Sequence, residues 1–118
     1  MRQEVIGDVL VLNVVGRAGS GGARQLADVL STAIENGYRR ILCDLEGLDY
    51  ASSPGLLALD AAAERIRRGG GELLLCGLTG PVRIALELSG IEPHFDVAEC
   101  RPSALARWAH GRSAASEE

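Results

Sequence analysis

Short apolar runs alternate with longer amphipathic segments along this chain. Residues 5–15 are strand-like, and Gly7-Asp8 interrupts them with the residues of a tight hairpin turn. Two later apolar runs, at residues 41–45 and 72–76, predict buried strands, and residues 95–97 predict a short edge strand. The pattern therefore predicts a hairpin followed by three further strands.

Amphipathic segments predict four helices between and after these strands. The first ends at Asn36-Gly37, where the glycine suits a left-handed cap. The second opens at residues 52–55 and ends at the glycines of residues 69–71, the third runs over residues 81–90, and the fourth begins at Pro102. The first helix has apolar residues at three- and four-residue steps: Leu26, Val29, Leu30, Ala33 and Ile34.

The order of these elements predicts an α/β fold. Strands that alternate with helices after an initial hairpin favour a mostly parallel or mixed sheet of four to five strands. Right-handed crossovers that advance in one direction place about four helices mainly on one face. We expect a single domain over residues 1–110, followed by a disordered polar tail at residues 111–118.

The basic residues exclude several chemistries. All 12 of them are arginine, so the chain lacks the lysine of a P-loop ATPase and of Schiff-base catalysis. The formal net charge of −4 argues against a broad nucleic-acid surface, which needs clustered positive charge. Aromatic residues make up only 3%, so Leu, Val, Ile and Ala must build the core.

Apolar length and cysteine usage indicate a cytoplasmic location. The longest apolar stretches, residues 9–15 and 73–78, are far shorter than the ~18 residues of a membrane span, and no signal-peptide pattern is present. Cys43, Cys76 and Cys100 lack the Cys-x-x-Cys spacing, which favours buried reduced thiols over a redox pair. The two histidines, His94 and His110, are remote from the first two cysteines, so no metal site is expected.

The segment Ser52-Ser53-Pro54-Gly55 allows two interpretations. A serine hydroxyl can cap the N–H groups of the next helix, with proline at the first helical position. The same positive helix N-terminus can also accommodate a phosphate on a serine. The segment by itself leaves both interpretations open.

The glycine-rich residues 16–22 are compared with a dinucleotide-binding loop. From Gly19 they have the pattern Gly-x-Gly-x-x-Arg, with Arg24 where the third glycine is required. A flexible connection is the favoured interpretation. No Gly-x-Ser-x-Gly elbow and no cysteine-phosphatase loop is present either, so the sequence predicts neither an enzyme nor a cofactor.

Four segments together resemble the STAS domain in its stand-alone bacterial form, the anti-sigma factor antagonist. They are the strand at residues 41–45, the serine loop at residues 52–56, the Gly-Gly strand at residues 70–76 and the helix at residues 81–91. Their order and spacing match the family's strand, Asp-Ser-Ser/Thr-Gly-Leu loop, Gly-Gly strand and Ser-Gly-Leu helix end. The resemblance extends over nearly the whole chain apart from the tail.

This resemblance implies a binding protein that is switched by phosphorylation. In the family, the unmodified protein binds a serine-kinase anti-sigma factor and frees the sigma factor. The kinase supplies ATP and phosphorylates the serine that follows the loop's aspartate, which by position is Ser53 here. A metal-dependent serine phosphatase reverses the modification. Direct contact with nucleic acid or membrane is not expected, and the protein is expected to be a monomer or weak homodimer.

The resemblance also indicates which residues contact the partner. Ser52 stands where the family often has aspartate, Pro54 replaces the second hydroxyl residue, and Gly16-Arg17-Ala18-Gly19 replaces the family's Gly-Glu-Leu-Asp. That early loop helps to contact the kinase in the family. The partner-binding residues expected here are Ser52, Ser53, Pro54, Gly55, Leu56, Arg17, Gly19 and Ser20.

Two alternatives to the antagonist remain open from sequence. A scaffold or transporter-accessory STAS protein has the same fold and binds other partners. A nucleotide-binding or enzymatic α/β domain would use residues 16–22. Size-exclusion chromatography distinguishes the first alternative, and calorimetric titration with nucleotides distinguishes the second.

Overall fold

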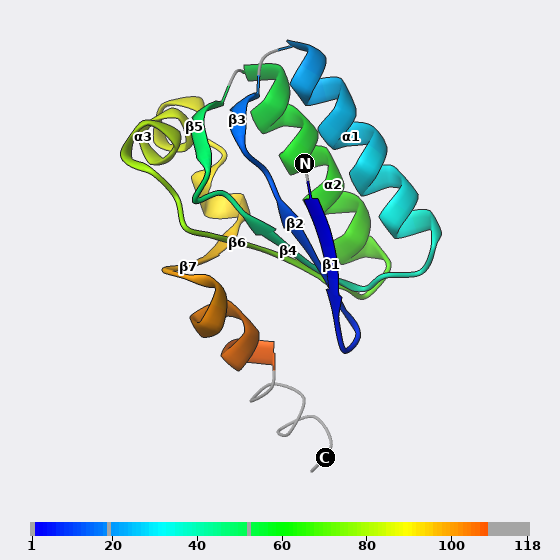
Figure 1. Cartoon of the computed structure of the whole chain (residues 1–118). Helices are drawn as coiled ribbons and strands as arrows, with labels where there is room; N and C mark the ends of the chain where they lie inside the picture. Colours follow the sequence, from blue (N-terminus) through cyan, green and yellow to red (C-terminus); the bar gives the residue numbers. More distant parts are fainter. Residues whose placement is uncertain (1, 19, 52, 109–118) are drawn as a thin grey trace.

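A five-stranded mixed sheet forms the centre of the molecule (Figure 1). The computed structural model describes residues 2–18, 20–51 and 53–108, and for residues 16–18, 20–23 and 49–51 it describes the backbone alone. β1 is antiparallel to β2, and all later neighbours are parallel, which confirms the predicted mixed sheet with its N-terminal hairpin. In spatial order the strands are β1 (Arg2–Ile6), β2 (Val9–Asn13), β4 (Arg40–Asp44), β6 (Glu72–Cys76) and β7 (Asp96–Ala98).

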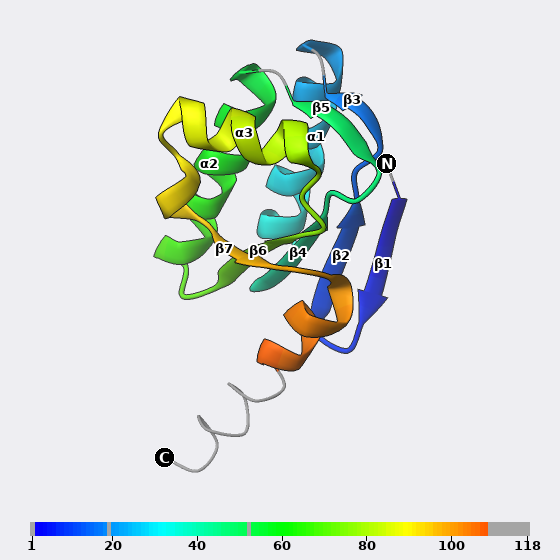
Figure 2. The same cartoon turned by 90° about the vertical axis from the view of Figure 1, so that its left-hand side faces the viewer.

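Three helices cover one face of this sheet, and a fourth covers the other (Figure 2). α1 (Ser20–Glu35), α2 (Ser53–Arg68) and α3 (Gly80–Ser89) bury their apolar sides on the first face. The helix at residues 101–108 places Ala104 and Trp108 on the second face. This arrangement confirms that the helices lie mainly on one side.

Because helices cover both faces of the sheet, its central strands have continuous apolar sequences. Residues 41–44 of β4 and residues 73–76 of β6 are buried throughout, because a strand with helices on both sides has no solvent face. β1 lies at the edge of the sheet and is exposed at four of its five residues. The continuous apolar runs in the sequence are therefore the signature of the central parallel strands.

A second, two-stranded parallel sheet corrects one prediction. β3 (Gly16–Ala18) pairs with β5 (Leu48–Ala51), where the sequence predicts a flexible glycine-rich connection over residues 16–22. α1 begins at Ser20, within the same predicted loop. Short strands that are formed by pairing between distant segments carry no periodic signal, and so the pattern of residues 16–22 did not indicate them.

Glycines end two elements as the sequence predicts. Gly37 follows α1 with φ +91°, a left-handed conformation that glycine adopts without steric cost. Gly71 lies where the chain turns from α2 into β6, and a Cβ there would be 2.3 Å from the carbonyl oxygen of Arg39. The Gly-Gly pair before β6 thus allows β4 and β6 to start close together.

The last elements differ slightly from their predicted positions. The edge strand is β7, at Asp96–Ala98, and a 3₁₀ turn, η1 (Glu92–His94), precedes it. Phe95 is buried in the core instead of forming part of the strand, because it packs beneath the helices. The predicted tail at residues 111–118 lies outside the described residues, so its predicted disorder remains a prediction.

Candidate functional site

Ser53 is exposed at the first residue of α2. β5 ends at Ala51, so the chain passes from the end of the small sheet directly into this helix. Pro54 is the second residue of α2, although the sequence predicts it at the first helical position. The N–H groups of the first turn make no hydrogen bonds within a helix, so the missing N–H of Pro54 costs no such bond. Gly55 and Leu56 are buried, and they fix the first turn of α2 in the core.

The start of α2 is electrostatically suited to an anion. The helix spans 16 residues, and its first turn has no acidic side chain. The aligned peptide dipoles of such an end carry partial positive charge. Arg65, Arg67 and Arg68 lie in the last turn, at the negative end of the dipole. A phosphate on Ser53 would therefore lie at the favourable end of the helix.

The small sheet brings the other predicted residues to the same end of the molecule. β3 runs parallel to β5 with Arg17 opposite Tyr50, and α1 starts two residues after β3 ends (Figure 1). We call this region the Ser53 end, defined as β3, β5, and the first turns of α1 and α2. It includes the backbone of Arg17 and Ser20, whereas Gly19 and Ser52 lie outside the described residues.

Leu57 is a surface residue in the second turn of α2, next to the Ser53 end, that the sequence pattern did not single out. Its side chain is 60% exposed, although the neighbouring Leu56 is buried. An exposed leucine beside an exposed serine provides apolar contact area next to the proposed phosphate position. The sequence carried no signal that separates Leu57 from Leu56, because adjacent positions of an amphipathic helix can both be buried, as Ala62 and Ala63 are in α2.

The sequence predicts that all three cysteines are buried, and two of them are. Cys43 and Cys76 are buried, but Cys100 is exposed because it follows β7 at the surface. In the register of β4 and β6, Cys43 is opposite Leu75 and faces the α1–α3 side, whereas Cys76 faces the other side. The two thiols thus lie on opposite faces of the sheet, which excludes a disulfide between them.

Burial makes these two thiols unreactive. Desolvation raises the pKa of Cys43 to about 12, with a smaller contribution from Cys76. Desolvation, and then the neighbouring Asp44 carboxylate, raises the pKa of Cys76 to about 12. Since the thiolate is the nucleophile and the metal ligand, neither group suits catalysis or metal binding near neutral pH.

Two further features bear on ligand binding. His94 Nδ1 lies 2.9 Å from Asp60 Oδ1, which joins η1 to α2; His110 lies outside the described residues. Among the residues that the structure describes, no three His, Cys, Asp or Glu side chains are grouped as metal ligands. None of the helices in the described ranges combines the length and apolar character that a membrane crossing needs.

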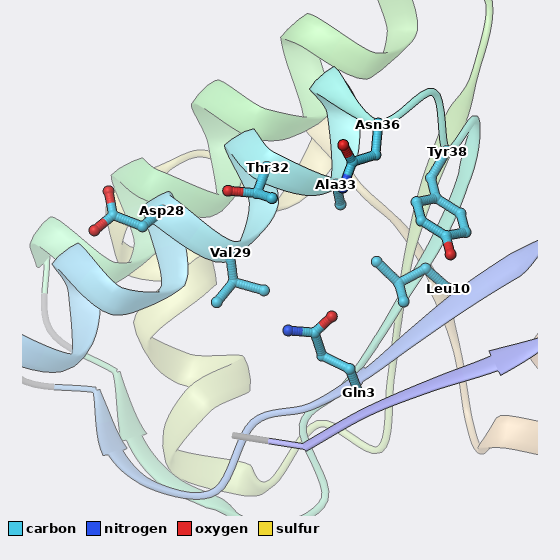
Figure 3. Close-up of a pocket in the computed structure, with 8 residues that line it drawn as sticks. All are labelled: Gln3, Leu10, Asp28, Val29, Thr32, Ala33, Asn36 and Tyr38. Atoms are coloured by element: carbon cyan, nitrogen blue, oxygen red, sulfur yellow. The ribbon is translucent and has the colours of Figure 1, made fainter.

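A cavity between α1 and the hairpin is small. Figure 3 shows Gln3 and Leu10 facing Val29 and Thr32 of α1. The space that these residues line has a volume of about 200 Å³. Small-molecule sites usually enclose about 300–1,000 Å³. The cavity is lined by α1 residues between 28 and 33, by Asn36 and Tyr38 and by the hairpin, so it does not belong to the first turn of α2. Ser53 itself lies on the exposed surface, which suits contact with a macromolecule.

Comparison with known proteins identifies relatives over most of the chain. The sequence model of the STAS domain matches residues 1–104. A relative from Bordetella bronchiseptica, named as an anti-sigma factor antagonist, BtrV, is 37% identical over 106 residues, which cover 90% of this chain and 91% of that protein.

Solved structures share the fold. The anti-sigma factor antagonist SpoIIAA in its unphosphorylated form has a TM-score of 0.81 at 22% identity and covers 92% of this chain and 96% of its own. Phosphorylated SpoIIAA, a Bacillus cell fate determinant, has a TM-score of 0.72 at 21% identity, with 90% and 96% covered. A sulfate transporter family protein from Wolinella succinogenes has a TM-score of 0.75 at 26% identity, with 88% and 87% covered.

Proposed function

The chain belongs to the STAS domain family, and we propose that it is an anti-sigma factor antagonist whose partner binding is switched by phosphorylation of Ser53. In the unmodified form it binds a serine-kinase anti-sigma factor in the cytoplasm, and the sigma factor is released. The kinase then transfers the γ-phosphoryl group of its ATP to the Ser53 hydroxyl, leaving ADP, and the modified protein dissociates. A metal-dependent serine phosphatase hydrolyses the phosphoserine and restores binding.

One observation carries this proposal: Ser53 is exposed at the positive end of α2, beside the exposed Leu57. The hydroxyl is accessible to a kinase, and the helix end accommodates the phosphate without rearrangement. The phosphate adds about −1.5 to −2 charges to a surface that must lose its water on docking. Release therefore follows from repulsion and desolvation at the interface, with the fold retained.

The relative at 37% identity supports an antagonist over a transporter accessory. The likeness to the Wolinella protein concerns a shared fold, which hosts more than one function. Size-exclusion chromatography separates the two proposals, since a large self-assembly would favour a scaffold. The nucleotide-binding alternative is weakened because Arg24 stands where the dinucleotide pattern requires its third glycine.

Phosphorylation of Ser53 is tested with candidate anti-sigma kinases and ATP. Intact-mass analysis should show one added phosphate on the wild-type protein and none on Ser53→Ala. Ser53→Asp should weaken binding of the kinase roughly tenfold or more, about 1.4 kcal/mol, and leave the circular dichroism spectrum unchanged.

Ser103 provides a matched control for this experiment. It is exposed in the first turn of the helix at residues 101–108, on the other side of the sheet. Ser103→Asp adds the same charge in the first turn of a helix on the opposite face, and it should leave kinase binding unchanged as long as Arg101, two residues away on that helix, keeps its contacts with Asp44. Equal phosphorylation of wild type and Ser53→Ala, or full-strength binding by Ser53→Asp, would overturn the proposal.

A further inference from the structure

The main sheet and the Ser53 end are joined at one place. Asn13 and Asp44 are the last residues of β2 and β4, and they are opposite each other in the parallel register. Beyond these residues the two segments of the chain leave the main sheet and pair again as β3 and β5. At the point where they turn, the N–H of Val14 donates a hydrogen bond to the Asp44 carbonyl oxygen at 3.1 Å.

Asp44 is a buried acid at this junction, with 9% of its surface exposed. The Arg101 guanidinium, from the start of the C-terminal helix, lies over it: Nη2 is 3.2 Å and Nε 3.3 Å from Asp44 Oδ2. A buried carboxylate needs such compensation, because removal from water penalises its charged form. Arg101 thus supplies the positive charge that compensates the buried Asp44 carboxylate at the junction.

The same guanidinium also contacts β1 and β2. Arg101 Nη1 lies 3.4 Å from both carboxylate oxygens of Glu4, and Arg101 Nη2 donates to Asn13 Oδ1. The amide of Asn13 in turn donates to Glu4 at 3.3 Å. One side chain therefore joins the C-terminal helix to three adjacent strands, using the planar fork of donors that only arginine has.

From Asp44 the contacts continue toward Ser53. Asp44 Oδ1 accepts a bond from the N–H of Glu46 at 3.1 Å, and the N–H of Leu48 donates to the Leu45 carbonyl at 3.0 Å. Leu48 starts β5, and its own carbonyl accepts the Thr79 hydroxyl at 3.0 Å. β5 then ends two residues before Ser53. The Asp44 carboxylate is thus hydrogen-bonded to the turn that leads into β5.

We propose that Arg101 is a positioning residue for the Ser53 end. By holding Asn13 and Asp44 together, it fixes the points from which β3 and β5 leave the main sheet, and through β5 the orientation of Ser53. The C-terminal helix, on the opposite face of the sheet, thereby acts on partner binding without touching the partner. The statement about binding rests on the proposed function; the statement about the junction does not.

Hydrogen exchange tests the junction without any partner. The variant is Arg101→Gln, and the matched control is Arg107→Gln on the same helix, whose guanidinium makes one 3.5 Å contact with the Val97 carbonyl. An open cavity of about 520 Å³ borders Asp44 and Arg101, so water can hydrate the carboxylate in the variant. Arg101→Lys, which keeps the charge but not the fork, is the second variant if Arg101→Gln does not fold.

Arg101→Gln should raise amide exchange about tenfold in residues 14–18 and 45–51, and Arg107→Gln should not. Arg101→Lys should give a smaller increase in the same segments. If exchange rises only within residues 101–108, or does not change, Arg101 serves only to fasten its own helix and the proposal fails.

Binding provides the second measurement. At a temperature where circular dichroism shows both variants folded, Arg101→Gln should lose several-fold in affinity for the anti-sigma kinase, and Arg107→Gln should bind as wild type does. Unchanged affinity despite raised exchange would overturn the link to the partner. If the wild-type protein binds no such kinase, the proposed function fails while the exchange result still decides the role of Arg101 at the junction.

Discussion

Cys43 shows how one residue's surroundings decide its chemistry. It lies one position from Asp44 in β4, yet its side chain faces the α1–α3 side, where it belongs to the apolar core. Cys43 and Cys76 lie in β4 and β6, two strands that the sequence predicts and that pair with each other. The faces on which they lie depend on the register of pairing, because a shift of one residue exchanges the two sides.

Alkaline pH should destabilise the protein through Cys43. Burial raises the pKa of its thiol from 9.0 to about 12, so between these values the unfolded chain loses a proton that the folded chain keeps. The contribution of Cys43 to the free energy of unfolding therefore falls as pH rises through this window, by up to about 1.4 kcal/mol per pH unit, and Cys76, whose pKa is raised in the same way, adds to the fall. The absence of lysine removes one class of group that titrates there, while two tyrosines remain.

Urea titrations at several pH values from 8 upward measure this slope. Cys43→Ala should make it shallower, whereas Cys100→Ala, at an exposed thiol, should leave it unchanged. An equal slope in wild type and Cys43→Ala would show that the buried thiol does not titrate on unfolding.

At the scale of elements, the helix at residues 101–108 depends on a single aromatic anchor. Trp108, the only tryptophan, is buried with Ala104 against Val11, Leu42 and other residues of the second face. Trp108→Ala should lower the free energy of unfolding by about 3–5 kcal/mol, because it removes the largest side chain of this cluster. Leu105→Ala on the same helix, where Leu105 is only partly buried, should cost less.

Urea denaturation followed by circular dichroism compares the two variants, and wild-type tryptophan fluorescence reports whether this helix detaches with the rest of the fold. A cost for Trp108→Ala no larger than that for Leu105→Ala would mean that the helix contributes little to stability.

The elements that sequence predicts well are those whose signal is local. The apolar steps of α1, the caps at Gly37 and the glycines before β6 are written within a few residues of the structure that they specify. β3 and β5 exist only because they pair with each other across more than 30 residues, and neither is long enough for a period. Their positions could not be predicted from either segment alone.

The residues of the candidate site also differ in whether local sequence predicts them. The helix start at Ser53 was predictable because a hydroxyl residue, a proline and a glycine mark it within four positions, whereas the role of Ser53 as phosphoacceptor came from the family resemblance and stays a prediction. Arg101 was not, since its partners Asp44 and Glu4 are 57 and 97 residues away in the chain. Ion pairs of this kind follow from the fold and leave no mark in local sequence.

At the scale of the whole molecule, charge sets how the switch depends on salt. The chain carries a net charge of −4, and Ser53 is exposed, so added negative charge there is screened by ions. Raising the salt concentration from about 0.05 M to about 0.5 M should therefore reduce the difference in kinase affinity between wild type and Ser53→Asp. Calorimetric titration at both concentrations measures this. A difference that salt does not alter would indicate that the modification acts through shape.

The main sheet has the same strand order in space as along the chain. During synthesis, each new strand can therefore be added at the growing edge, beside the strand and helix that precede it, without waiting for a distant partner. The surface of Val11, Leu42 and Leu74 is the exception, because it is covered only when residues 101–108 leave the ribosome. Until then the nascent domain exposes this apolar patch to chaperones. An mRNA truncated before the codons for residues 101–108 would yield a product that is prone to aggregate.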